Sequence, residues 1–594
     1  MNSIPARMRR NGTDPMSKNK TGYSYKKGIE WIECSFEQYY QECMQVARSL
    51  IALGLQKEGK ISILSFNRPE WIIADVGCMM AGGVPAGIYQ TCSPQEVQYI
   101  IHHSESLVVF VENQEQWDKV NKQIEHLPLL QYIVTMKGCS IEDERTLTWE
   151  QFLSKGEAVA PAEVDKRIDE IEAQQPATFI YTSGTTGPPK AVMISHGNLV
   201  YTADQALPIV ELNDDDCTLS YLPLSHIAEQ VFSIHGPISA QSAVFFAESI
   251  EKLPQNLQEV CPSVFFGVPR IWEKFYAKLN AGLAEAPFVR KKIAAWAMDI
   301  GRKCAELRNR GESPTGLLKM QYNMANSLVF SKIKKKIGLS RAKVCVSGAA
   351  PISAEVLEFL SGLDIIIHEV YGQSEDCGPT TFNRPGNNKY GTVGTAFPGV
   401  DVKIADDDEI LVRGKNVFLG YYKDEEATNK TLIDGWLHSG DLGKFDEDGF
   451  LTIIGRKKEI IITAGGKNIA PKNIEAALKD ITLISQSVVI GDKRKFLSAL
   501  LTLEPEATEK FASEKGIPLD QIHENRVLLD TLQTEIERVN EAFARVEHVR
   551  KFKVLPRDFS VDEGELTPTL KIKRRVINVN WADTIESMYA EQNP

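Results

Sequence analysis

The stretch Tyr181–Leu199, YTSGTTGPPKAVMISHGNL, decides the fold more than any other part of this 594-residue chain. An apolar run enters a loop of Ser, Thr and Gly that ends on Lys190, and a second apolar run, Ala191–Ile194, follows. Glycines let a backbone approach a polyphosphate closely, and consecutive N–H groups form a nest for anions. We therefore expect a phosphate-binding loop between two strands.

The loop offers hydroxyl donors, backbone donors and one cation to a phosphate. It is not a Walker loop, because its spacing is GxxGxxK and Ala191 stands where the Mg-binding Ser or Thr would be. A Ser/Thr/Gly composition alone is also typical of a flexible turn, and only the order of the residues favours phosphate binding. The candidate nucleotide ligands here are Thr182, Ser183, Gly184, Thr185, Thr186, Gly187, Pro188, Pro189 and Lys190, with Thr186 also a candidate catalytic residue.

In this order the loop resembles the signature of the adenylate-forming enzymes, a superfamily of acyl-CoA synthetases, luciferases and adenylation domains. The resemblance covers about residues 60 to 575 and implies further motifs in a fixed order, which follow the loop as expected. They are YLPLSHIAEQ around His226, SGAAP (Ser347–Pro351), EVYGQSE (Glu369–Glu375), GWLHSGDLG (Gly435–Gly443), GRKKEIIITAGGKNI (Gly455–Ile469) and LTPTLKIKRR (Leu566–Arg575).

The resemblance assigns ATP to several of these motifs. Tyr371 would stack on adenine, and Ser374, which replaces the family's Thr, would lie near the α-phosphate. Glu375 would hold Mg²⁺, since this ion takes one or two carboxylates beside phosphate oxygens on nucleotides. The implied adenine and phosphate contacts are Gly348, Ala349, Glu369, Val370, Tyr371, Gly372, Gln373 and Ser374.

Four more residues complete the implied chemistry. Asp441 would accept hydrogen bonds from the ribose hydroxyls, and Arg456 would contact ribose and phosphate. Lys571 would bridge the substrate carboxylate and the α-phosphate, and His226 would lie beside the acyl site. Singly, each has an ordinary explanation, such as a core histidine, a turn carboxylate or a solvated charge run. Their common order favours the enzyme.

The segment Gly455–Ile469 resembles the family's hinge. Lys458 would be the pivot of a rotating C-terminal domain, and Gly465 and Gly466 would border the channel for a thiol. The resemblance thus implies two steps: ATP activates a carboxylic acid as an acyl-adenylate, and coenzyme A then takes the acyl group.

The fold class expected is α/β: a large N-terminal domain of α/β layers plus a distorted β subdomain, and a small mobile α+β C-terminal domain. From Lys60 onward, short apolar runs alternate with helical stretches, which favours a mostly parallel sheet covered by helices. We expect an N-terminal extension with a lead-in helix over residues 1–55, the large domain over 56–458 and the small domain over 459–594.

Composition excludes several classes. A formal charge of −12 argues against a general nucleic-acid binder, and 43% hydrophobic residues argue against disorder. The ten cysteines form no CxxC pair, so we expect reduced, mostly buried thiols in a cytoplasmic protein. The basic start, residues 1–20, allows a weak transit peptide but favours a disordered tail.

Residues 273–340 are helical in pattern, and 290–336 hold twelve Lys or Arg against three acids, a net charge of +9. Three interpretations stay open: a solvated helical face, steering of coenzyme A phosphates, or peripheral contact with anionic lipid, either on the endoplasmic reticulum or on another membrane.

The motifs YLPLSHIAEQ, YGQSE, GWLHSGDLG and IITAGGKNIAP look closest to the bubblegum-type branch of long-chain fatty acyl-CoA synthetases. We therefore expect a long-chain, or very-long-chain, fatty acid–CoA ligase whose partners are fatty acid, ATP and coenzyme A. Gln230 stands where some long-chain relatives have a gating Trp, so tunnel gating does not carry over. The alternatives are a luciferase-like enzyme, a ligase for medium-chain or aromatic acids, or a catalytically silent scaffold; chain length and oligomeric state stay undetermined.

Overall fold

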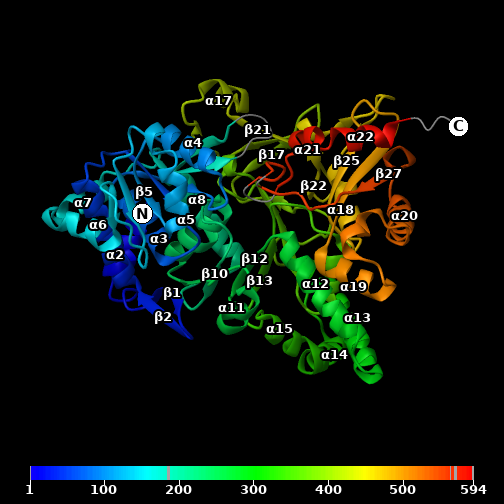
Figure 1. The fold of residues 1–594 in the computed structure, drawn as a ribbon. Helices are drawn as coiled ribbons and strands as arrows, with labels where there is room; N and C mark the ends of the chain where they lie inside the picture. The colour runs from blue at the N-terminus through cyan, green and yellow to red at the C-terminus, as the bar shows by residue number, and fades with distance from the viewer. Residues whose placement is uncertain (1, 183–187, 562, 568–570, 591–594) are drawn as a thin grey trace.

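A computed structural model of the chain describes residues 2–182, 188–561, 563–567 and 571–590 (Figure 1). Five residues of the predicted phosphate loop lie outside this described part. They are Ser183, Gly184, Thr185, Thr186 and Gly187.

The largest sheet has eight strands, and six of them are parallel. The apolar runs that predict strands near residues 61, 84, 107 and 177 form its centre. In spatial order the strands are β19 (Gly420–Tyr421), β9 (Lys190–Ser195), β8 (Pro176–Thr182), β4 (Val84–Ile88), β3 (Lys60–Leu64), β5 (Ser106–Val111), β6 (Tyr132–Thr135) and β7 (Thr146–Thr148).

Helices cover both faces of this sheet, as a parallel sheet requires. On one face, α2 (Phe36–Ala52) and α3 (Pro69–Met80) share a core with the β3 residue Ile63. On the other, α4 (Pro94–Ser104) packs against the following residue, Leu64. Every residue of α3 is buried. The alternation of strand and helix predicted from the sequence is confirmed.

The start of the chain is folded, so the expectation of a disordered tail is wrong. Helix α1 (Ile4–Thr13) begins at the N-cap Ser3, with Pro5 in its first turn. Ile4 and Met8, one helical turn apart, are fully buried, and Arg7 donates a 2.8 Å hydrogen bond to Asp204. The two apolar residues anchor the helix on the core.

Two further sheets extend the large α/β part. In one, the N-terminal strand β1 pairs in parallel with β11. In the other, β12, β13 and β14 are parallel. The first contains β10 (Cys217–Ser220), β11 (Ala243–Phe246), β1 (Thr21–Lys27) and β2 (Glu30–Ser35); the second contains β12 (Val264–Gly267), β13 (Val344–Ser347), β14 (Ile367–Tyr371), β15 (Thr381–Phe382) and β16 (Thr395–Ala396).

The region between β12 and β13 is helical, as predicted for residues 273–340. It consists of α12 (Pro269–Ala284), α13 (Phe288–Asn309), α14 (Gly316–Ala325), a π-helical turn over Asn326–Phe330 and α15 (Ser331–Ile337). These helices form the lower edge of the molecule in Figure 1. Among the described residues, no helix is long and apolar enough to cross a bilayer.

A mostly antiparallel β region and the C-terminal part follow. The first sheet comprises β17 (Asp401–Ile404), β18 (Glu409–Arg413), β21 (Trp436–Phe445), β20 (Leu432–Ile433) and β22 (Leu451–Arg456). Beyond it come the hairpin β23 (Ile461–Ile462) and β24 (Asn468–Ile469), then the sheet β25 (Ile484–Ile490), β26 (Leu497–Leu503) and β27 (Val549–Val554). The α+β character expected of this part is confirmed, while the boundaries at residues 55 and 458 stay predictions.

The remaining α-helices lie along the chain as follows: α5 (Gln114–Asn121), α6 (Trp149–Lys155), α7 (Pro161–Asp169), α8 (His196–Val210), α9 (Ile227–Gln230), α10 (Gly236–Ala240), α11 (Leu253–Val260), α16 (Ala354–Gly362), α17 (Glu425–Thr431), α18 (Pro471–Lys479), α19 (Pro505–Lys515), α20 (Arg526–Asn540), α21 (Arg574–Asn580) and α22 (Ala582–Tyr589). All ten cysteines are free thiols and seven are buried, as predicted.

Candidate active site

The predicted phosphate loop joins two antiparallel strands. Thr182 at the end of β8 pairs with Lys190 at the start of β9, so the two strands hold both ends of the loop at one point. The Lys190 ammonium lies 3.3 Å from Asp424 Oδ2 and 4.8 Å from the centre of the Tyr421 ring. Its side chain is about 39% exposed, which leaves the cation within reach of a bound anion.

Tyr421 and Asp424 were not among the predicted site residues. The Tyr421 hydroxyl donates a 2.8 Å hydrogen bond to Glu375 Oε1, and Tyr421 stands opposite Val192 where β19 pairs with β9. One short segment therefore contacts both the loop lysine and the predicted magnesium ligand. No local sequence signal links these groups, because the strand pairing joins positions more than 200 residues apart.

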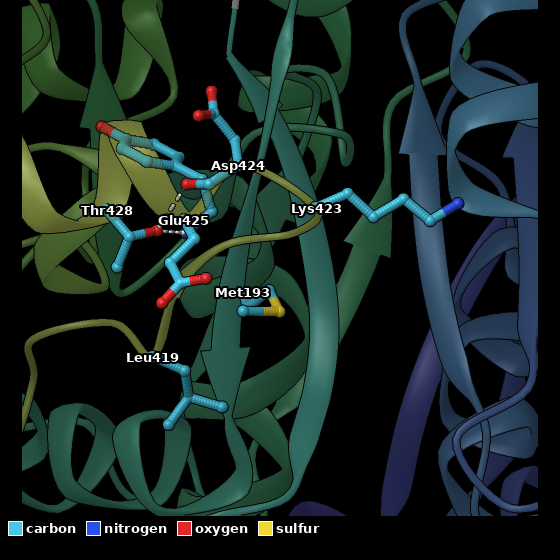
Figure 2. A pocket seen from close by; sticks show the side chains of 7 residues that line it. Met193, Leu419, Lys423, Asp424, Glu425 and Thr428 are labelled. Carbon is cyan, nitrogen blue, oxygen red and sulfur yellow. Dashed lines mark hydrogen bonds between the residues drawn. The ribbon is translucent and has the colours of Figure 1, made fainter.

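Beside this segment lies an open pocket of about 440 Å³. In Figure 2, Asp424 and Glu425 lie among its labelled side chains, while Lys423 points away from the others. Lys423 is engaged elsewhere, 2.9 Å from Glu105. The lining residues are Met193, Leu419, Tyr421, Lys423, Asp424, Glu425 and Thr428.

Asp441 joins two of the predicted nucleotide ligands. It pairs with Arg456 across β21 and β22, and Arg456 Nε lies 3.0 Å from its Oδ1. The Tyr371 hydroxyl donates a 2.9 Å hydrogen bond to its Oδ2. A carboxylate has about four lone-pair sites, so Asp441 keeps capacity for two more donors. The hydroxyls of one ribose are donors of this kind.

The turns after β13 and β14 follow the carboxyl ends of two neighbouring parallel strands, where open α/β sheets bind ligands. A Cβ on Gly348 would lie 2.7 Å from the Val370 side chain, and one on Gly372 would lie 1.5 Å from the Gly378 carbonyl oxygen. Ala349 has a positive φ of 69°. At position 372 only glycine permits this approach of backbone to backbone.

Lys571, in the C-terminal part, lies near the charged side chains of Arg456, Asp441 and Glu375. Its side chain is accessible to solvent although protein surrounds it on most sides. This environment and the positive charges of Arg456 and Lys472 lower the pKa of Lys571 to about 8, against the opposing effect of Asp441 and Glu375. Two residues further on, Lys573 lies 3.8 Å from Glu96 at the N-terminus of α4.

His226 lies near Lys571 as a neutral imidazole. Burial and the Lys571 charge lower the pKa of His226 to about 3. Its Nδ1 accepts a 3.2 Å hydrogen bond from the Ala228 N–H, so the ring proton is assigned to Nε2. Gln230 is fully buried and donates to the Leu224 carbonyl.

The remaining predicted site residues differ in their exposure to solvent. Lys458, Gly465 and Gly466 are exposed: Lys458 follows the end of β22, and the two glycines lie in the turn between β23 and β24. The Glu369 side chain is buried, and burial raises its pKa to about 8. Pro188 is exposed and Pro189 half-buried. Among the described residues, no group of three or more His, Cys, Asp or Glu could hold a metal ion. A nucleotide-bound Mg²⁺ needs fewer, because phosphates supply the other ligands.

The sequence matches two family descriptions in succession: "AMP-binding enzyme" over residues 16–422 and "AMP-binding enzyme C-terminal domain" over residues 458–593. The chain therefore belongs to the AMP-binding, adenylate-forming enzyme family, as the motifs predicted.

Within that family the chain is similar to bubblegum-type ligases. It is 39% identical to the long-chain-fatty-acid–CoA ligase ACSBG2 of Xenopus laevis, covering 95% of this chain and 81% of the relative. It is 36% identical to human ACSBG2 (95% and 89% covered) and 36% identical to ACSBG1 of Rattus norvegicus (97% and 84% covered).

Solved structures share the fold at low identity. The anthranilate CoA ligase AuaEII, in complex with anthranoyl-AMP, superimposes with a TM-score of 0.73 at 19% identity, covering 98% of both chains. The adenylation domain of a carboxylate reductase from Mycobacterium chelonae gives a TM-score of 0.76 at 18% identity, covering 99% of this chain and 91% of the other. The predicted fold class is confirmed.

Proposed function

We propose that the protein is a long-chain fatty acid–CoA ligase that forms AMP. It activates the acid with ATP to an acyl-adenylate and pyrophosphate, and then transfers the acyl group to coenzyme A. The observation that carries this proposal is the convergence of Lys571, Arg456, Asp441 and Tyr371 at one place. The names of the relatives support the choice of a long-chain acid.

In the first step, the substrate carboxylate attacks the α-phosphorus of ATP. Both reactants are anionic, so the transition state needs cations, which Lys571 and Lys190 supply. Glu375 is available to bind Mg²⁺, which supplies charge neutralisation on the phosphates when it is bound. Asp441 and Arg456 hold the ribose, and the neutral His226 can donate from Nε2 beside the acyl group.

In the second step, the thiol of coenzyme A attacks the acyl carbonyl and AMP leaves. We propose that the C-terminal part rotates about Lys458, removing Lys571 and bringing Gly465 and Gly466 to the thiol channel. Exposure of these three residues supports the proposal, since a hinge and a moving edge must be free of core packing.

The experiment that tests this function is product analysis with ATP, coenzyme A and a C16 fatty acid. We expect palmitoyl-CoA and AMP in equal amounts. Light emission dependent on oxygen, with no thioester, would replace this function by the luciferase-like alternative. Thioesters formed only from short or aromatic acids would overturn the long-chain assignment.

Tyr421 is proposed to position Glu375. In Tyr421→Phe the 2.8 Å hydrogen bond to the carboxylate is lost while the ring beneath Lys190 remains. We expect the Mg²⁺ concentration for half-maximal adenylation to rise about tenfold, the scale of one hydrogen bond to a charged group. Tyr422→Phe is the matched control, because that hydroxyl donates to Glu105 instead. Equal Mg²⁺ dependence in the two variants would refute this role.

The pKa of Lys571 predicts a pH dependence. Only the ammonium form stabilises the phosphate, so kcat/KM for adenylation should fall as pH rises above about 8. In Lys571→Arg the guanidinium stays charged to beyond about pH 12, and the fall should shift upward by two units or more, even if the maximum is lower. An unchanged alkaline limb in Lys571→Arg would assign the titration to another group.

We further propose that the enzyme works in the cytoplasm at an anionic membrane surface, contacted through the basic insertion 290–336. Ten free thiols support a reducing compartment. Arg308 and Lys334 pair with the buried Asp364, so they serve the fold. The other ten cations of the insertion are exposed.

A further inference from the structure

We infer that the insertion carries a membrane-insertion face, and that α14 and the π-helical turn after it place apolar side chains among the lipids of an anionic bilayer. The face consists of Leu317, Met320, Met324 and Leu328, called the α14 stripe below. Their exposed fractions are 71%, 67%, 56% and 45%.

The stripe lies on one side of the helix. Leu317, Met320 and Met324 are spaced by three and four residues, which places them on one side of α14, and Leu328 follows four residues later in the π-helical turn. Other residues pack this segment onto the rest of the protein: Ala325, Val329 and Phe330 are buried in the core of this region. The α14 stripe is therefore not needed for packing against the protein core and stays exposed.

Exposed apolar side chains concentrate in this region. Of the seventeen large exposed apolar residues among those described, seven lie between residues 288 and 328. Besides the stripe, they are Phe288, Val289 and Ile293 in the first turns of α13. Singly scattered apolar residues need no explanation, but a concentration rimmed by polar groups marks an interaction site.

The charges around the stripe select its partner. Exposed cations flank it, including Lys319 within α14 and Lys332, Lys335 and Lys336 just beyond it. An apolar face bordered by Lys and Arg is the composition of helices that lie in the bilayer interface, and each such cation near anionic lipid contributes to binding. A second copy of the chain fits poorly, because a two-fold contact would set this net charge of +9 against itself.

The position of the stripe agrees with this partner. Helices α13 and α14 project at the lower edge of the molecule, whereas β21 and β22 lie in its upper half (Figure 1). A flat bilayer can therefore meet the insertion while the nucleotide site stays in water. The helical region that contains the insertion begins with α12, directly after β12. The β12 residue Phe266 stacks on Phe232 in the π-helical turn that follows His226 and α9. The helical region is thus joined to the side of the molecule where the acyl group is proposed to bind.

The test separates apolar insertion from simple charge attraction. The full chain is floated with vesicles of phosphatidylcholine containing phosphatidylserine, and with phosphatidylcholine alone, at low and high salt. The stripe variant carries Leu317→Ser, Met320→Ser, Met324→Ser and Leu328→Ser. The matched control carries Ser at four other exposed apolar positions, Ile433, Val527, Val546 and Val579.

We expect the wild type to bind the anionic vesicles and to keep part of this binding at high salt. The stripe variant should lose at least tenfold in partition coefficient at both salt concentrations, while the control variant binds as the wild type does. Substituting Lys319, Lys332, Lys335 and Lys336 by Glu should remove the salt-sensitive part.

Three results would overturn the inference: equal binding by the stripe variant and the wild type, wild-type binding that high salt abolishes, or a wild-type dimer that the stripe variant turns into a monomer. A bimane probe on Met320→Cys gives a second reading, since its emission should shift to the blue with vesicles. The purpose inferred for this lipid contact rests on the proposed ligase function. Vesicle binding is measured without substrates, so a loss of binding and a lack of ligase activity are separate results.

Discussion

Replacing Lys571 by Ala should lower the rate of acyl-adenylate formation by about 10²–10³-fold, the scale of one charged group aimed at a developing oxyanion. Transfer of the acyl group from a supplied acyl-adenylate to coenzyme A should stay within a few fold of wild type. The reason is geometric: Lys571 lies among Arg456, Asp441 and Glu375 in this conformation and has no part in the thiol step as proposed.

The two half-reactions are measured separately, the first by pyrophosphate release without coenzyme A and the second by thioester formation from the adenylate. Arg575→Ala is the matched control, since this cation is exposed and four residues away. An equal loss in both half-reactions of Lys571→Ala would show a general structural defect. It would remove the residue from the proposed mechanism.

Asp441→Ala should produce the second large effect, a rise of about 10²-fold in the KM for ATP, because two hydrogen bonds from the ribose to a charged acceptor are lost. The substitution also leaves Tyr371 and Arg456 without the carboxylate that joins them. The wild type should discriminate against 2′-deoxy- and 3′-deoxy-ATP, and Asp441→Ala should not.

This loss of discrimination is the outcome that a purely structural role of Asp441 does not produce. Asp446→Ala serves as the control, because that carboxylate pairs with Lys389 away from the site. If Asp441→Ala still rejects deoxy-ATP as strongly as the wild type, then another group holds the ribose.

The central sheet was predictable because its strands are buried on both faces and read as continuous apolar runs. Val108–Val111 is an example, and it forms a strand of the large sheet beside Ile61–Leu64, where the buried Ser62 interrupts the apolar run. The start of the chain was not recognised. Few residues there indicate a helix: the N-cap Ser3 and the apolar pair Ile4 and Met8. The basic residues around them are typical of a disordered tail.

The candidate site was predictable where a motif keeps its residues together, and less so where the fold assembles it. Asp441 was expected from GWLHSGDLG, but its contact with Tyr371 depends on two sheets meeting. No sequence motif links Tyr421 and Asp424 to Glu375 or Lys190. The pairing of β19 with β9 in the fold brings these residues together. The roles assigned to the loop residues 183–187 stay predictions, since these residues lie outside the described part.

Net charge gave an incomplete view of the insertion. The excess of Lys and Arg was evident from the sequence, and the apolar spacing at 317, 320, 324 and 328 was equally present. Nothing in the sequence alone says which of two apolar faces of α14 is buried. Packing of Ala325 and Phe330 against the core decides that, and it leaves the α14 stripe outside.

The measurement that tests the central claim most directly is ATP–pyrophosphate exchange with saturated fatty acids from C4 to C24. We predict exchange that depends on the acid, is weak for C4 and reaches its maximum at C16 or longer. Absence of exchange with every acid would show a silent scaffold of the same fold, and a maximum at short chains would contradict the assignment as a long-chain fatty acid–CoA ligase.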